Sequence, residues 1–473
     1  MFVTCMAIRL AIAFFSFVII LFTALFTSTG CANIIPPSGG PRDSLPPQLI
    51  KSTPADSSKN FSGNRITFTF DEYIEVQNIY SNLIVSPIPE ENPTVDYRLN
   101  TMTVKFKDSL ESNTTYSFNF GKAIKDYNEG NVLMNFSFVF STGPALDSLE
   151  LKGNVILAES GKTDSTLIAI LHKREDDSAL VKSRPRYMAK LDKEGSFVFK
   201  NLPAGKFYLY ALQDQSGSGK YMDTKQLFAF ADSPVIVQQG TLPVTLYAYA
   251  ETAATMPGIT TQRPRGGTAE NRLRYQTSVS NSKQDILQPF KFVFETALKT
   301  FDSTKIRFTS DSTFQTVPGY SWGIDSTEKI VQLNFSWQEN TLYHFIMEKD
   351  FAVDTTGKML LKPDTISFRT NAKSDYGSLK LRLSNVDFSV NPVLQLLLNN
   401  EIKKSIPINS EEISEPLFIP GDYELRVLYD KNKNGKWDPG EFFGKHRQPE
   451  IVKPIDQRIN VKPGTDNNFE IQL

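Results

Sequence analysis

Short segments in which apolar and polar residues alternate run through most of the chain, and this period of two constrains the fold most. Examples are "RITFTF" (65–70), "TMTVKF" (101–106) and "NFSFVFSTG" (135–143), each bounded by turn-forming residues. Successive side chains of a strand point to opposite faces, so such segments fit half-buried β-strands. No long amphipathic helical pattern competes with them. The sequence therefore predicts an all-β chain of tandem β-sandwich domains.

Two different segments each occur twice, which indicates a pair of domains that is repeated. Residues 113–143 parallel residues 340–370, and residues 201–223 parallel residues 418–438. The predicted array is A1 (48–144), B1 (149–250), a flexible linker rich in Pro, Gly and Thr (251–285), A2 (286–372) and B2 (376–473). With a hinge at the linker, we expect a rod that bends once.

The first thirty residues read as a targeting segment rather than as part of the fold. Arg9 precedes an apolar run over 10–26, and small residues follow up to Cys31. The pattern resembles a lipoprotein signal peptide (1–30), whose cleavage would leave Cys31 as the acylated N-terminus. Residues 31–47, rich in Pro and Gly, then form a tether. The alternatives are an uncleaved transmembrane anchor and an incidental cysteine.

The charge of the chain bears on nucleic acid as a partner, and its cysteine content bears on disulfide bonds. The 51 basic and 52 acidic residues give a net charge of −1, so nothing favours nucleic acid as a partner. The only cysteines are Cys5 and Cys31, and Cys5 would leave with the signal peptide. A mature chain that begins at Cys31 thus has no pair for a disulfide.

Several segments resemble known families. "ITFTFDEYIEV", "SNTTYSFNFGKAIKDYNEGNVL" and "FVFSTG" in A1 resemble the bacterial Ig-like domain of the S-layer (SbsA) type, and A2 is a more diverged copy. "LKGNV" and "DKEGSFVFKNLPAGKFYLYALQD" in B1 are similar to the prealbumin-like regulatory domain of carboxypeptidases, a β-sandwich without catalysis of its own. From Cys31 onward the chain resembles Ig-like-domain lipoproteins of Bacteroidota-type bacteria. The resemblance implies an envelope lipoprotein with no established reaction.

The stretch "DKNKNGKWDPGE" (430–441) has the spacing of a calcium-binding loop. Oxygen-bearing groups fall at positions 1, 3, 5, 7, 9 and 12, with Gly435 at position 6, and the predicted ligands are Asp430, Asn432, Asn434, the Lys436 carbonyl, Asp438 and Glu441. Because strands and not a pair of helices flank the loop, a structural Ca²⁺ is favoured over a switch. The loop resembles the B repeats of staphylococcal Sdr surface proteins, and this resemblance implies a structural role for calcium. The alternative is a polar turn whose side chains satisfy their own backbone. The equivalent B1 loop at Asp214 lacks acidic residues at positions 9 and 12, so no tight site is expected there.

Ten Asp-Ser or Asp-Thr motifs recur along the chain and resemble the O-glycosylation sequon of Bacteroidota envelope proteins. The candidate acceptors are Ser44, Ser109, Ser148, Ser165, Ser178, Ser303, Ser312, Ser326, Thr355 and Thr365. The alternative is ordinary turn chemistry of Asp and Ser in β-proteins.

Residues that could carry catalysis are scattered. His172, His344 and His446 fall in separate domains, and the pair Asp71 and Glu72 is expected at the structural edge of a strand. We therefore predict no enzymatic activity.

Tyr208, Tyr210 and Tyr221 in B1 either pack inside the sandwich or form a platform for sugars.

Taken together, these features predict a lipid-anchored (palmitate-bearing) cell-envelope protein with a structural or interaction role. The predicted location is the outer membrane, held by the lipid anchor; the absence of acidic residues after Cys31 favours the periplasmic side, and surface exposure stays open. The expected partner is an envelope protein or a glycan. The alternative is a glycan- or peptide-binding accessory lipoprotein of an outer-membrane uptake or secretion system.

Overall fold

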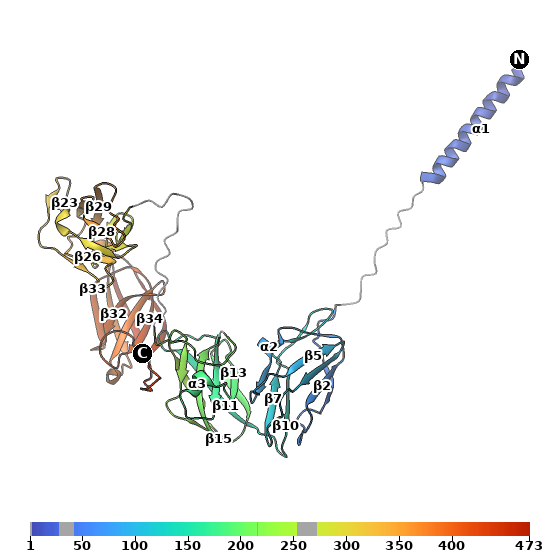
Figure 1. Cartoon of the computed structure of the whole chain (residues 1–473). Helices are drawn as coiled ribbons and strands as arrows, with labels where there is room; N and C mark the ends of the chain where they lie inside the picture. The colour runs from blue at the N-terminus through green and yellow to red at the C-terminus, as the bar shows by residue number, and fades with distance from the viewer. Residues whose placement is uncertain (1, 28–41, 215, 253–271) are drawn as a thin grey trace.

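The computed structural model describes residues 2–27, 42–214, 216–252 and 272–473, and these residues are almost entirely β beyond the N-terminal helix (Figure 1). That helix is α1 (Phe2–Thr27), which covers most of the predicted signal peptide. Cys31 and most of the predicted tether lie outside the described residues. Within the described part of the chain, no helix combines the length and apolar character needed to cross a membrane.

A1 is a sandwich built around a phenylalanine-rich core. Its main sheets have the strand orders β1-β2-β6-β5 and β10-β7-β4, and a small sheet β3-β8-β9 closes one end. The elements are β1 (Leu49–Thr53), β2 (Arg65–Phe70), β3 (Ile74–Val76), α2 (Ile79–Asn82), β4 (Ile84–Ser86), β5 (Thr94–Arg98), β6 (Thr101–Lys105), β7 (Thr115–Asn119), β8 (Ile124–Asp126), β9 (Val132–Leu133) and β10 (Ser137–Ser141). The alternation in β2 places Ile66, Phe68 and Phe70 in the core, as the period of two predicts.

A2 repeats this arrangement. Its sheets are β19-β21-β26-β25, β20-β29-β27-β23-β24 and the pair β22-β28. The elements are β19 (Tyr275–Thr277), β20 (Lys283–Gln284), β21 (Phe290–Phe294), β22 (Leu298–Phe301), η1 (Ser303–Lys305), β23 (Ile306–Ser310), β24 (Gln315–Thr316), β25 (Ser321–Ile324), β26 (Ile330–Asn334), β27 (Leu342–Met347), β28 (Ala352–Asp354) and β29 (Asp364–Thr370).

The linker prediction is wrong for the residues just before A2. Leu273 is buried in the A2 core, β19 pairs with β21, and β20 pairs with β29. These strands are two and three residues long, too short to show a period of two. The stretch from 273 to 285 therefore belongs to A2, and residues 253–271 of the predicted linker lie outside the described residues.

B1 and B2 share a second sandwich topology. In B1 the sheets are β14-β11-β18 and β13-β12-β15-β16, with β17 also on β15; in B2 they are β33-β30-β36 and β32-β31-β34-β35. The B1 elements are β11 (Leu149–Leu157), β12 (Leu167–His172), α3 (Ala179–Lys182), β13 (Tyr187–Lys190), β14 (Ser196–Leu202), β15 (Gly205–Gln213), β16 (Phe228–Phe230), β17 (Val235–Val237) and β18 (Val244–Ala248). The B2 elements are η2 (Lys373–Asp375), β30 (Gly377–Ser384), η3 (Phe388–Val390), β31 (Pro392–Leu398), β32 (Glu401–Pro407), β33 (Glu412–Phe418), β34 (Gly421–Tyr429), β35 (Ile451–Val461) and β36 (Asp466–Gln472). Both copies include one parallel pair, β11 with β18 and β30 with β36.

The domains do not follow one another in space as they do in sequence. B1 packs against A1 on one side and against B2 on the other, and A2 sits on B2, so the spatial order is A1, B1, B2, A2 (Figure 1). The expectation of a rod hinged between B1 and A2 is therefore wrong. A direct contact between B1 and B2 brings the two halves of the chain together instead.

Candidate functional site

The loop between β34 and β35, residues 430–450, contains the predicted calcium ligands. Its first residue, Asp430, is 2% exposed because it follows the inward-facing residues of β34. The Asp430 carboxylate accepts the backbone N–H groups of Asn434 at 3.2 Å and Gly435 at 2.7 Å. Gly435 has a φ of +75°, which this tight turn requires. Asp430 thus folds the loop around its own side chain.

Asp438 closes the same turn from the other side. The side-chain amides of Asn432 and Asn434 donate to Asp438 Oδ2 at 2.8 and 2.7 Å. The amide oxygens of the two asparagines accept the backbone N–H groups of Asn434 and Lys436. Four of the predicted ligand residues are therefore brought together in one network of hydrogen bonds.

Glu441, the predicted ligand at position 12, lies elsewhere. Its backbone forms an antiparallel bridge with Arg447, and its carboxylate contacts Lys445 at 2.8 Å and Arg447 at 3.8 Å. Among the described residues, three acidic groups close enough to hold one ion occur only at Glu72, Asp126 and Glu129. Calcium binding at residues 430–441 stays a prediction.

Glu450 is the residue of this loop that the sequence reasoning missed. It is 4% exposed and accepts the backbone N–H groups of Lys431 at 2.7 Å and Asp438 at 3.1 Å. Burial raises the pKa of its carboxyl, and the nearby Asp430 adds to this effect. Its position twelve residues after Asp438 lies outside any twelve-residue loop pattern, so motif spacing could not identify it.

The B1 loop has the same scaffold with fewer charges. Asp214 accepts the backbone N–H groups of Ser218 at 3.1 Å and Gly219 at 2.8 Å, the contacts that Asp430 makes in B2. The turn around the first Asp carboxylate is therefore common to both copies of the repeated domain.

Beyond the turn, the B2 loop forms the contact with B1. Phe442 is 1% exposed and inserts among aromatic side chains of the B1 sheet, with ring centroids 5.8, 5.1 and 4.9 Å from Tyr210, Phe228 and Phe230. Gly440 permits this approach, since a Cβ there would lie 2.5 Å from the Tyr249 ring. The sequence feature that corresponds to this contact is the apolar pair "FF" at 442–443 within a polar loop.

This contact decides between the two interpretations of the B1 tyrosines. Tyr210 and Tyr221 are 7% and 5% exposed and belong, with the partly buried Tyr208, to the cluster that covers Phe442. They pack at a domain junction and do not form an open platform for sugars.

Polar contacts surround the aromatic centre of the B1–B2 junction. Gln448 Nε2 donates to the carbonyl of Phe230 at 2.9 Å, and the Phe442 N–H donates to Glu251 at 3.2 Å. His446 Nε2 lies 2.8 Å from Asp177 Oδ2. An apolar centre with a polar rim is typical of a specific interface.

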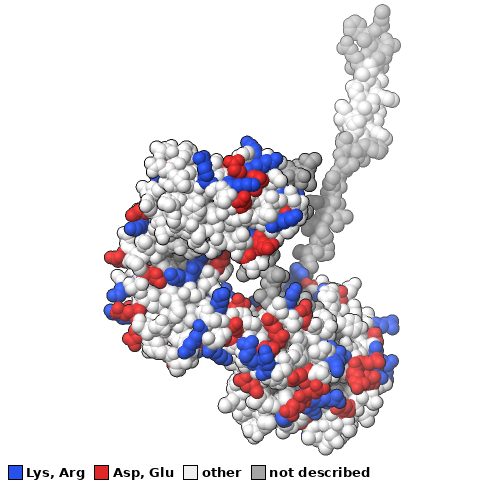
Figure 2. Space-filling model, turned by 60° about the vertical axis from the view of Figure 1, so that its left-hand side comes forward, with Lys and Arg blue, Asp and Glu red and all other residues white. Residues whose placement is uncertain are grey.

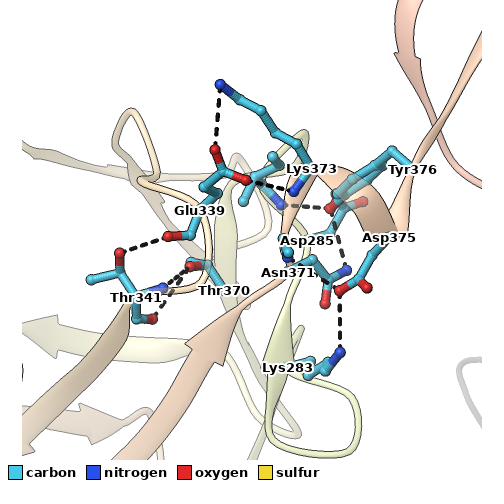
Figure 3. Close-up of polar contacts among 11 residues, drawn as sticks. Lys283, Asp285, Glu339, Thr341, Thr370, Asn371, Lys373, Asp375 and Tyr376 are labelled. Carbon is cyan, nitrogen blue, oxygen red and sulfur yellow. Dashed lines mark hydrogen bonds and ion pairs between the residues drawn. The ribbon is translucent and has the colours of Figure 1, made fainter. Parts of the chain in front are cut away.

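The junction between A2 and B2 is polar and centred on Tyr376 (Figure 3). The Tyr376 hydroxyl donates to Asp285 at 2.5 Å and accepts from the Ile286 N–H at 3.0 Å and the Asn371 amide at 3.3 Å. Burial, followed by the hydrogen bond to Asp285, raises the pKa of Tyr376 to about 12. An ion pair of 3.2 Å between Lys283 and Asp375 adds a second link.

Two arginines of B1 contact A1 at the junction between these domains. Arg186 pairs through both Nη atoms with Glu111, and this hydrogen bonding holds the pKa of Glu111 below its usual value. Arg184 donates to the carbonyl of Glu90 at 3.0 Å. The Ile88 N–H donates to the Arg186 carbonyl at 2.8 Å, so the backbones of the two domains also pair.

The acidic residues at the end of A1 are largely structural. Asp71 accepts the Gln48 N–H at 2.7 Å, which is the edge role expected from the sequence. Asp126 is 1% exposed; burial favours its neutral form, but hydrogen bonds from the backbone of the 128–131 turn outweigh this and lower its pKa. Burial and the neighbouring carboxylates raise the pKa of Glu72.

The Asp-Ser/Thr motifs share a turn in five places. The Asp carboxylate accepts the hydroxyl of the residue two positions later, which leaves the residue between them exposed at the apex of the turn: Ser165, Ser303, Ser312, Ser326 and Thr355. Ser44, Ser109 and Ser148 are exposed outside this turn, and Thr365 is exposed within β29. Ser178 differs, because it is half-buried and its hydroxyl donates to Asp176.

Comparison with known proteins identifies one domain. Residues 43–142 match the family model described as a bacterial Ig-like domain. No curated protein matches the chain. The chain is thus a tandem β-sandwich protein whose first domain matches the bacterial Ig-like domain model.

Solved structures to which the chain shows some similarity include pilin and S-layer proteins. BcpA, the major pilin subunit of Bacillus cereus, is 11% identical, with 69% of this chain and 99% of that chain covered and a TM-score of 0.17. The N-terminal part of the bacterial S-layer protein SbsC is 16% identical, with 44% of each chain covered and a TM-score of 0.16. An L,D-transpeptidase from Mycobacterium smegmatis is 12% identical, with 42% and 79% covered and a TM-score of 0.16. At these TM-scores the similarities carry no argument about fold or function.

Proposed function

We propose that the protein is a non-catalytic structural and interaction protein of the cell envelope, anchored in a membrane by lipid at Cys31. The observation that supports this proposal most is the construction of the array. Each domain has its own core, and three specific junctions hold the four domains in one order. Such an array presents defined surfaces at a distance from its anchor. Acidic and basic side chains are interspersed on the face in Figure 2, which suits a protein without a strongly charged partner.

The anchor is tested by metabolic labelling with a palmitate analogue. Wild-type protein is expected to take up label and to fractionate with the outer membrane, and Cys31→Ser to lose both properties. Crosslinking in intact cells, read by mass spectrometry, then identifies the envelope protein or glycan that contacts the array. Label on Cys31→Ser equal to that on the wild type would reject the anchor.

One observation favours the second candidate function, an accessory protein that binds a glycan or peptide. Tyr73 and Tyr127 are 54% and 67% exposed, and the Tyr127 N–H donates to the Tyr73 carbonyl at 2.9 Å, so the two residues are neighbours just beyond the paired strands β3 and β8. Exposed aromatic faces suit sugar rings. Glycan-array binding that is lost in Tyr73→Ala with Tyr127→Ala would select this function, whereas Tyr97→Ala, another exposed tyrosine of A1, is the control.

We also propose a structural Ca²⁺ in the B2 loop, with Asp430, Asn432, Asn434 and Asp438 as its side-chain ligands. The support is their convergence within hydrogen-bond distance of one another. Calorimetric titration of the full chain with Ca²⁺ should show one site that Asp438→Asn removes. Asp214→Asn changes the equivalent B1 turn and should leave the binding unchanged. Titration without a saturable signal would mean that the loop is a polar turn only.

A further inference from the structure

A cavity of about 230 Å³ lies at the B1–B2 junction, lined by residues of both domains. Ser160 and Lys162 reach it from the turn after β11, and Asn400, Arg426 and Pro454 reach it from B2. Leu397 of β31 and Glu424 and Leu425 of β34 complete the wall. Ligand sites occur preferentially between domains, where one molecule can contact both.

The strand pairing of the B2 sheet is irregular where the sheet lines this cavity. The irregularity affects two pairs of strands, β31 with β32 and β34 with β35. The register of β31 on β32 shifts between Leu396 and Leu397, and the register of β34 on β35 shifts between Glu424 and Leu425. Leu397, Glu424 and Leu425 are all wall residues. Bulges of this kind redirect side chains and are common beside binding sites.

Arg426 is the most distinctive group in the wall. Its Nε donates at 2.7 Å to Oε1 of Gln395, a residue 2% exposed, so the guanidinium is held by a fixed partner. Among the described residues, no carboxylate lies within 4 Å of this guanidinium. Glu424 lines the same wall, but its carboxylate pairs with Arg458 and not with Arg426. Burial lowers the pKa of Arg426, while Glu159 of B1 partly offsets that effect.

An arginine held through Nε keeps its two Nη groups as donors, and paired donors of this kind match the oxygens of a carboxylate, phosphate or sulfate. Lys162 adds a second positive charge from B1. By volume the cavity has room for about eight water-sized groups. We propose that it binds a small ligand bearing an oxyanion, which Arg426 of B2 and Lys162 of B1 hold between the two domains. The proposal is independent of the lipid anchor and of calcium.

The test is calorimetric titration of the full chain, at constant ionic strength, with succinate, inorganic phosphate and sulfate as probes. At least one probe should bind saturably in the millimolar range, with about tenfold weaker binding in Arg426→Gln. Lys162→Gln, at an exposed position, should weaken binding by about two- to fivefold. This variant still tests the proposal if Arg426→Gln does not fold. Arg307→Gln, on the exposed side of A2 strand β23, is the matched control and should bind as the wild type does.

The choice of probe identifies the ligand's anionic group. Binding of succinate alone indicates a carboxylate, and binding of phosphate or sulfate alone indicates that group. The proposal is overturned if none of the three probes saturates the wild type, or if both cavity variants bind as tightly as the wild type.

Discussion

His172, at the end of β12, is a buried residue whose chemistry makes the stability of B1 depend on pH. It is 5% exposed, and its Nε2 has no hydrogen-bond partner among the described residues. Burial lowers its pKa from 6.5 to about 4, because the protonated ring cannot be solvated there. The unfolded chain therefore binds a proton between pH 6.5 and 4 that the folded chain does not bind.

The stabilisation from neutral His172 is fully present above pH 6.5 and is lost as the pH falls towards 4. We expect the free energy of unfolding to drop by about 3 kcal/mol across this window in the wild type. His172→Gln should remove most of that slope. Urea unfolding at several pH values measures both slopes, and parallel curves for the two proteins would contradict the assignment.

At the scale of single elements, the 430–450 loop combines a self-contained turn with a docking contact. Truncating Phe442 removes a ring that is packed on all sides by Tyr210, Phe228 and Phe230, so Phe442→Ala should cost about 3 to 5 kcal/mol. Phe443→Ala is the matched control, because Phe443 is adjacent and 37% exposed. Denaturant unfolding of the full chain should separate the two variants; equal stabilities would show that the loop does not hold the junction.

The A2–B2 junction gives a prediction of a different kind, because it depends on one hydroxyl. Tyr376→Phe keeps the ring and removes the group that bonds Asp285, Ile286 and Asn371. Leaving these partners unsatisfied should cost about 1 to 3 kcal/mol. Thermal unfolding followed by calorimetry would detect the loss, with Tyr320→Phe in A2 as the control for removing a tyrosine hydroxyl.

The same elements show what the sequence could and could not predict. Alternation in long strands such as β2 and β34 indicated which residues face the core, because burial on one face imposes a period of two. Strands β19 and β20 gave no such signal, since three and two residues cannot display a period. At the candidate site, the motif spacing identified Asp430 and Asp438. It could not identify Glu450, because the position of Glu450 beside them depends on the path of the chain after the loop.

At the scale of the whole molecule, the order of the domains in space could not be read from their order in sequence. Each repeat was visible as a local pattern, but the B1–B2 contact joins residues about 200 positions apart, such as Gln448 and Phe230. A long-range contact of this kind leaves only a weak trace, here an apolar pair within a polar loop. The repeat was therefore predictable and the arrangement was not.

This arrangement predicts that the two halves of the chain recognise each other without a covalent link. Residues 42–252 contain A1 and B1, residues 272–473 contain A2 and B2, and every domain keeps its own core in these pieces. Expressed separately, the halves should associate with 1:1 stoichiometry, because the aromatic centre and polar rim of the B1–B2 junction are intact. Analytical ultracentrifugation measures the complex. Phe442→Ala in the second half should weaken association by more than about tenfold, as expected for a buried aromatic anchor, whereas Phe443→Ala should have a smaller effect. Halves that stay apart at high concentration would mean that the junction forms only when the chain is continuous.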